Sequence, residues 1–160
     1  MEKPKIYLET TMFNFPFAPD LPGYKKHKED TLEILARIKA GEYKPYTSVY
    51  AAAEINGTNA EDKREQMRSL IDEYQVEVLP LNAEAERLAD LYVAEGAVPA
   101  GFPTDALHIA MTTVHRLDFI VSLNFEHIAR EWTIKKVEAV NAREGYKIIG
   151  IYRPMEVLAL

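Results

Sequence analysis

The sequence predicts a three-layer α/β/α sandwich whose central sheet has four to five strands, most of them parallel. Short apolar runs of the length of buried strands alternate with longer segments in which apolar residues recur at helical spacing. Because strands that alternate with helices pair in parallel, helices are expected to cover the faces of the sheet. The length of 160 residues and an apolar content of 48% fit a single domain, 1–160, with a core of ordinary size.

The first half of the chain is expected to alternate between the two kinds of element. The hydroxyls of Thr10 and Thr11 suit the start of a short helix, which the prolines between positions 16 and 22 must end. Ser48 is expected to cap a later helix. In order, we expect strand 5–8, a short helix after position 10, helix 24–40, strand 44–47, helix 48–55, helix 61–74 and strand 76–79.

The second half continues the same alternation. Asn82 and Thr104 are expected to cap two helices, and a loop that contains two prolines and a glycine separates them. A fully apolar strand follows, and then a turn into a short helix. In order, we expect helix 82–96, helix 105–115, strand 119–123, turn 124–127, helix 134–143 and strand 146–152.

Composition excludes several classes of protein. The chain has no cysteine, so disulfides, zinc–thiolate sites and thiol catalysis are ruled out, and a cytoplasmic protein is expected. No apolar run approaches the roughly 18 residues of a membrane-spanning helix, and the N-terminus does not resemble a signal peptide. The net charge of −6 does not point to nucleic acid, although basic residues cluster at Lys25–Lys28, Lys63–Arg68 and Lys135–Lys136. These clusters are most simply solvated helix faces.

Three carboxylates lie in unusually apolar surroundings. Glu9 follows the first strand, Glu54 interrupts an alanine-rich helix, and Asp105 opens an apolar helix. A desolvated carboxylate needs a basic partner, a set of hydrogen bonds or a cation. No Lys or Arg stands within three residues of Glu54 or Asp105, so a shared metal ion is an attractive hypothesis. The simpler alternatives are a helix-dipole role for Glu9 and Asp105 and a solvent-exposed Glu54.

The chemistry of such a site follows from its oxygen ligands. Carboxylates without Cys or convergent His favour hard cations, Mg²⁺ or Mn²⁺, which serve phosphoryl chemistry. Glu9 and Asn124 each follow a strand, and ligands of parallel sheets bind at that edge. Thr10 is expected to orient a carboxylate or its water, and His108, one turn beyond Asp105, to hydrogen-bond that carboxylate as a supporting residue. Asn124 is otherwise a common turn residue.

Four short segments in this order resemble the PIN domain family, and more narrowly its VapC-like toxin branch. They are Ile-Tyr-Leu-Glu-Thr-Thr at 6–11, Tyr-Thr-Ser-Val-Tyr-Ala-Ala-Ala-Glu-Ile at 46–55, Asp-Ala-Leu-His-Ile-Ala at 105–110 and Phe-Ile-Val-Ser-Leu-Asn-Phe-Glu-His-Ile at 119–128. The resemblance implies a PIN fold and a metal-dependent endoribonuclease that cleaves single-stranded RNA. It also implies that Mg²⁺ or Mn²⁺ is held by Glu9, Glu54 and Asp105, with Asn124 at the fourth acidic position of the catalytic set.

The same resemblance implies partners, and it leaves alternatives open. Toxins of this type often form homodimers and bind a small antitoxin protein. Glu9 stands where the family usually has Asp, and Asn124 brings no charge, so we expect at most one tightly bound metal ion. The first alternative is a catalytically weak or inactive PIN-fold module that binds RNA or protein. A metal-dependent phosphatase or other hydrolase on a different α/β sheet is the second.

Overall fold

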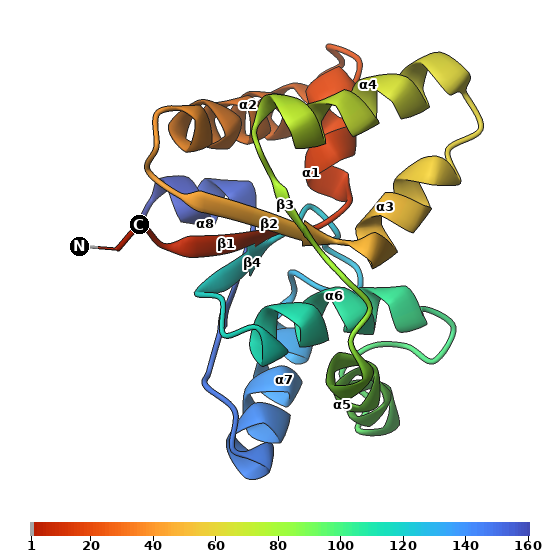
Figure 1. Cartoon of the computed structure of the whole chain (residues 1–160), viewed down its shortest axis with the longest axis vertical. Coiled ribbons are helices and arrows are strands. Elements are labelled where there is room, and N and C mark those ends of the chain that lie inside the picture. The colour runs from red at the N-terminus through yellow and green to blue at the C-terminus, as the bar shows by residue number, and fades with distance from the viewer. Residues whose placement is uncertain (1) are drawn as a thin grey trace.

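The five strands form one entirely parallel sheet (Figure 1). The structure, a computed structural model, describes residues 2–160. The order in the sheet is β3-β2-β1-β4-β5, and the strands are β1 (Lys5–Leu8), β2 (Lys44–Ser48), β3 (Glu77–Leu79), β4 (Phe119–Val121) and β5 (Gly150–Tyr152). Helices cover both faces, so the predicted α/β/α sandwich with a parallel sheet is confirmed.

The helices form two layers, one on each face of the sheet (Figure 1). One layer consists of α1 (Thr11–Asn14), a 3-10 turn (Phe15–Phe17), α2 (Lys25–Lys39), α4 (Glu61–Glu73) and α8 (Pro154–Leu158). The other consists of α5 (Ala83–Ala94), α6 (Pro103–Val114) and α7 (Glu131–Glu144). The remaining helix, α3 (Val49–Asn56), lies at the edge of the sheet, where it packs against both α4 and α6.

The first strand shows how the sequence builds these two layers. Successive side chains of a strand point to opposite faces. Ile6 and Leu8 pack into the core beneath α1, α2 and α4, whereas Tyr7 points into the core beneath α5, α6 and α7. All three are fully buried. The apolar run of β1 is therefore explained by burial on both faces, as expected for a central parallel strand.

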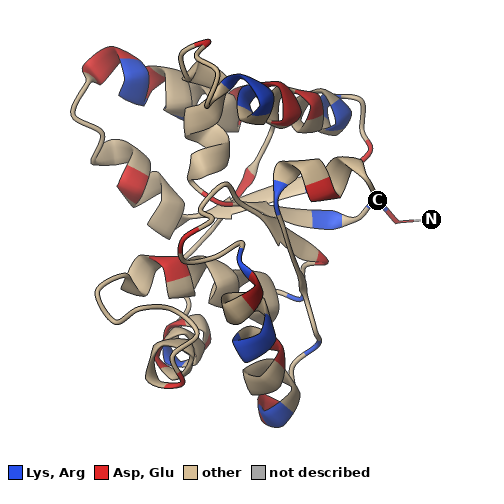
Figure 2. Cartoon of the chain, turned by 180° about the vertical axis from the view of Figure 1, so that it is seen from behind, with Lys and Arg blue, Asp and Glu red and all other residues tan. Residues whose placement is uncertain are grey.

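The outer faces of the helices carry most of the charge. Lys and Arg lie on several separate helices, α2, α4 and α7 among them, and do not gather on one face (Figure 2). This distribution fits the interpretation of the basic clusters as solvated helix faces. Within residues 2–160, every helix is too short or too polar to cross a bilayer.

Three of the four expected cap residues, Thr10, Ser48 and Asn82, stand at the start of a helix, and two of them cap it with their side chains. The hydroxyl of Ser48 accepts a hydrogen bond from the backbone of Ala51, and Asn82 caps α5 in the same way. Thr10 and Thr104 do not cap with their side chains. Helix α6 begins at Pro103, two residues earlier than expected, because proline suits the first helical position.

The last quarter of the chain differs most from expectation. No separate helix forms directly after the turn at 124–127, and α7 begins at Glu131, before the expected start. The last strand, β5, starts at Gly150, and residues 146 to 149, which were expected to belong to it, have no regular secondary structure. Helix α8 was not predicted. This five-residue helix is stabilised by burial of Pro154 and Val157 and by packing against α2, and the spacing of residues in the sequence does not reveal that contact.

Candidate metal site

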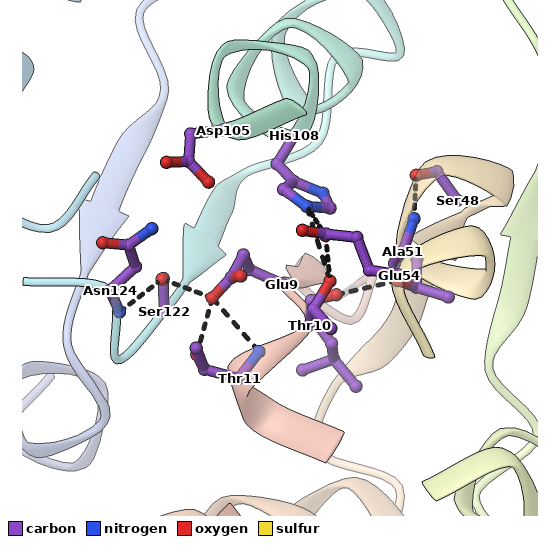
Figure 3. A network of polar contacts seen from close by, with 12 residues as sticks. Glu9, Thr10, Thr11, Ser48, Ala51, Glu54, Asp105, His108, Ser122 and Asn124 are labelled. Atoms are coloured by element: carbon purple, nitrogen blue, oxygen red, sulfur yellow. Dashed lines mark hydrogen bonds and ion pairs between the residues drawn. The ribbon is translucent and has the colours of Figure 1, made fainter. Parts of the chain in front are cut away.

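The predicted site residues meet where the order of the strands reverses. The chain runs outward from β1 to β2 and β3 and then returns to place β4 on the other side of β1. The crevice at such a switch point is where α/β sheets bind ligands. Glu9 directly follows β1, and its backbone N–H bonds the carbonyl of Val121 at the end of β4. Helices α3 and α6 bring Glu54, Asp105 and His108 to the same crevice (Figure 3).

Three side chains form a compact group of potential ligands. Glu9, Glu54 and His108 each have one potential ligand atom in this group, and the three atoms all lie within 4.8 Å of one another. Glu9 and His108 are buried, whereas the side chain of Glu54 is 38% exposed. The sequence predicted Glu9 and Glu54 as ligands and His108 only as a supporting residue, and the predicted ligand Asp105 is not part of this group.

Glu9 is a buried carboxylate without a Lys or Arg partner among residues 2–160. It is only 3% exposed, and no Lys or Arg in residues 2–160 forms an ion pair with it. Its Oε1 accepts hydrogen bonds from the hydroxyls of Thr11, at 2.5 Å, and Ser122, at 2.6 Å. Burial raises the pKa of Glu9, and these hydrogen bonds and the charge of His108 offset only part of that effect. A cation would favour the ionised form.

His108 links Glu54 to the core. Its Nε2 lies 2.6 Å from Glu54 Oε1, which also accepts a hydrogen bond from Thr10 at 2.6 Å. Its Nδ1 lies 2.6 Å from the hydroxyl of Tyr7, and that hydroxyl lies 2.7 Å from Ser48 Oγ. When His108 is protonated, it donates to both Glu54 and Tyr7, and Tyr7 donates onward to Ser48. The imidazole therefore fixes the position of Glu54.

The pKa values of this pair shift in opposite directions. Burial by itself lowers the pKa of His108, but the bond to Glu54 and the charges of Glu9, Glu54 and Asp105 raise it by more. Burial raises the pKa of Glu54, yet its bonds to His108 and Thr10 lower it overall. In the metal-free protein, the pair is therefore favoured as an imidazolium beside a carboxylate.

Asp105 faces the same crevice from the first turn of α6, and its carboxylate points toward the space above Glu9 (Figure 3). It is 8% exposed, and its Oδ2 lies 2.9 Å from Nδ1 of His127. The helical spacing predicts that His108 supports Asp105, but His108 instead pairs with Glu54, and His127 pairs with Asp105. The two histidines thus each hold one carboxylate.

Asn124 also lies at this edge, but its amide oxygen is already engaged. The side-chain Oδ1 of Asn124 accepts a hydrogen bond from the backbone N–H of His127 at 3.1 Å, and the backbone N–H of Asn124 donates to Ser122 Oγ. These contacts stabilise the turn that presents His127 beside Asp105. A direct role of Asn124 in metal binding stays a prediction.

Each of the three predicted carboxylate ligands keeps one oxygen free of protein hydrogen bonds. The engaged atoms are Oε1 of Glu9, Oε1 of Glu54 and Oδ2 of Asp105. Within residues 2–160, the one buried side-chain polar atom without a partner is Nε2 of His115, so the free oxygens of Glu9 and Asp105 reach solvent. Carboxylate oxygens are the ligands that Mg²⁺ and Mn²⁺ prefer. Glu9 and Glu54 supply two of them within the compact group, and Asp105 faces that group from α6.

Several residues that shape the site were missed in the sequence. Thr11 and Ser122 orient Glu9, Tyr7 holds His108, and His127 holds Asp105. In the sequence, Ser122 lies within the expected strand 119–123, and Tyr7 lies within the apolar strand 5–8. Ser122 could have been found because it places a hydroxyl inside an otherwise apolar run. It also lies near the carboxyl end of its strand, at the same edge of the sheet as Glu9.

A cavity of about 330 Å³ adjoins the site on the side of Glu54. Its walls come from α1, α3, the loop after α3, and α4, and the residues that line it are Thr10, Thr11, Asn14, Glu54, Thr58, Lys63 and Met67. Lys63 is the one basic residue in this lining, and no ion pair of Lys63 is found within residues 2–160. The cavity therefore offers a positive charge beside a group of carboxylates.

Comparison with known proteins gives a match in structure but not in sequence. No family model matches the chain, and no curated protein matches its sequence. Among solved structures, it is similar to a chain of VapBC2 from Rickettsia felis, crystallised bound to a DNA fragment from their promoter. The two are 14% identical, with a TM-score of 0.52 over 93% of this chain and 98% of that chain. At this identity the likeness concerns the fold alone, and the chain has the PIN-like α/β/α fold that its sequence predicts.

Proposed function

We propose that this protein is a metal-dependent endoribonuclease that cleaves phosphodiester bonds of single-stranded RNA. The observation that carries the proposal is the set of three carboxylates at the switch point of the sheet, each with one anchored and one free oxygen. None of the three forms an ion pair with a Lys or Arg of residues 2–160. The structural likeness to a VapBC2 chain supports a nuclease-type hydrolase in general.

Glu9, Glu54 and Asp105 would hold one Mg²⁺ or Mn²⁺ through their free oxygens. Such an ion lowers the pKa of a bound water and neutralises charge on phosphate oxygens. Within the protein, Thr11 and Ser122 fix the carboxylate of Glu9, while Thr10 and His108 fix that of Glu54. His127 orients Asp105. These contacts pre-organise the site before substrate arrives.

The neutral amide of Asn124 favours a second, weaker candidate. Because its oxygen is engaged by the backbone of His127, the fourth position of the site adds no charge and no free ligand. A PIN-fold module that binds RNA or protein with little catalysis is therefore the alternative function. Metal binding and RNA cleavage separate the two.

Asp105→Asn is expected to abolish metal-dependent RNA cleavage while the protein stays folded, because the amide removes one of the three charges that hold the cation. We would titrate Mn²⁺ and Mg²⁺ by calorimetry and follow a fluorescent single-stranded RNA in the same samples, with circular dichroism as the check on folding. Asp90→Asn on the exposed side of α5 is the matched control. Retained cleavage in Asp105→Asn would reject the site. A wild-type protein that binds no metal at millimolar concentration would reject the enzyme.

Lys63→Gln is expected to weaken RNA binding and to reduce its dependence on salt. If the Lys63 ammonium neutralises a phosphate, the slope of log K against log salt for a single strand falls by about 0.7. The control is Lys147→Gln, which makes the same charge change at the opposite edge of the sheet, where Lys147 pairs with Asp118. Equal slope changes in the two variants would indicate a general effect of net charge and not a contact in the cavity.

The partners that we propose are a small antitoxin protein and a second copy of the chain. One solved structure that resembles this chain is that of VapBC2, which supports an antitoxin-like partner.

A further inference from the structure

An exposed aromatic ring lies beside the candidate metal site. Phe102 is 48% exposed and immediately precedes α6, three residues before Asp105. Its backbone is held on both sides, because its N–H donates to the carbonyl of Pro99 and its own carbonyl accepts from the N–H of Asp105. With Pro103 next to it, this loop has few conformations open to it. The ring is therefore presented by a constrained backbone.

The ring is in contact with the candidate metal site through one residue. The centroids of Phe102 and His127 are 4.0 Å apart, with an angle of 39° between the ring planes. On its other side, His127 Nδ1 lies 2.9 Å from Oδ2 of Asp105. Phe102 is thus separated from a predicted metal ligand by a single imidazole.

The exposure of Phe102 is not explained by the stability of the fold. The core gains from aromatic rings that are buried, whereas about half of this ring stays in water. Aromatic rings beside the sites of proteins that act on single strands stack with unpaired bases. A base in a duplex is already stacked and is not available for such a contact.

We propose that Phe102 is a stacking platform for an unpaired base of the substrate, next to the phosphate that is cleaved. This role for Phe102 rests on the proposed function, cleavage of single-stranded RNA. It would explain why the protein prefers single-stranded over double-stranded RNA. Phe102 would hold the base on the Asp105 side of the site. The cavity lined by Lys63 lies on the other side, next to Glu54. The strand would then cross the crevice from α6 in one helix layer to α4 in the other.

The test compares Phe102→Ala, Phe102→Leu and Phe102→Trp. RNA affinity is measured by fluorescence anisotropy in EDTA, and quenching of 2-aminopurine placed at successive positions of the same RNA reports stacking. Phe102→Ala and Phe102→Leu are expected to bind about 5- to 150-fold more weakly and to lose the quenching. Phe102→Trp is expected to restore both. With metal present, KM is expected to rise with kcat nearly unchanged.

The matched control is Ile148→Ala, which removes an apolar side chain of equal exposure, 48%, from the segment that enters β5 at the opposite edge of the sheet. Its affinity is expected to equal that of the wild type. Overlapping affinities for Phe102→Ala and Ile148→Ala, or equal binding by the Leu and Trp variants, would overturn the platform alone, provided that Asp105→Asn still abolishes cleavage. Wild-type protein that neither binds nor cleaves RNA would overturn the platform and the proposed function together.

Discussion

Glu9→Gln is expected to abolish metal binding and RNA cleavage while stabilising the metal-free protein. The affinity for Mn²⁺ should fall by more than about 100-fold, since changes even in residues that only support a ligand cost about 10- to 100-fold. Gln brings no charge to desolvate, and its Oε1 can still accept hydrogen bonds from Thr11 and Ser122. We expect a gain of about 1 kcal/mol in the free energy of unfolding at neutral pH.

The pH dependence of this gain gives a second check. Burial raises the pKa of Glu9 in the folded protein, so the unfolded chain ionises first as pH rises, and ionisation then destabilises the fold. The advantage of Glu9→Gln should therefore disappear at acidic pH, where Glu9 is protonated in both states. Urea unfolding in EDTA and calorimetry with Mn²⁺ measure the two effects, with the exposed Glu138→Gln as control. A destabilised Glu9→Gln protein, or one that still binds metal, would contradict the prediction.

Tyr7→Phe is expected to lower the free energy of unfolding by about 1–3 kcal/mol, because it leaves Nδ1 of a fully buried His108 without a hydrogen-bond partner. The pKa of His108 is higher in the folded protein than in the unfolded chain. Protonation of His108 therefore stabilises the fold fully at pH values below its ordinary pKa, and this stabilisation is lost as pH rises through the pKa of the folded protein. Tyr7 accepts from that imidazolium. The loss should thus be largest at acidic pH and smaller at alkaline pH.

Urea unfolding of the two proteins in EDTA, at about pH 5.5 and about pH 9, tests this dependence. Tyr43→Phe removes a hydroxyl from a ring that packs on Phe119, so its effect should stay within about 0.5 kcal/mol at either pH. A loss for Tyr7→Phe that is the same at both pH values would show that the proton of His108 does not depend on Tyr7.

The sheet and most helices could be predicted because their signals are local. Apolar runs such as β1 are buried on both faces, and hydroxyl or amide caps such as Ser48 and Asn82 act on their own helices. Helix α8 escaped prediction because five residues carry too little periodicity, and its burial against α2 depends on chain folding far from it in sequence. Local patterns cannot supply that information.

The site was predicted in part for a related reason. Glu9, Glu54 and Asp105 stand out because carboxylates in apolar segments need a partner wherever the segment lies. Which histidine meets which carboxylate depends on the packing of α3, α6 and the turn after β4. Spacing along α6 suggested that His108 meets Asp105, but His108 reaches Glu54 on another helix, and His127 takes its place.

The anchoring of one oxygen on each carboxylate also bears on ion discrimination. A carboxylate that is free to rotate can offer both oxygens and adapt its reach to a large ion, as Ca²⁺ sites do. Glu9, Glu54 and Asp105 are each held at one oxygen, which restricts the rotation of each carboxylate. A rigid site of this kind, with its remaining coordination left to water and phosphate, suits a small octahedral ion. If the proposed site binds a metal ion, we expect the hydroxyls of Thr11 and Ser122 and the imidazoles of His108 and His127 to influence its selectivity between Mg²⁺ and Ca²⁺ by holding the carboxylates.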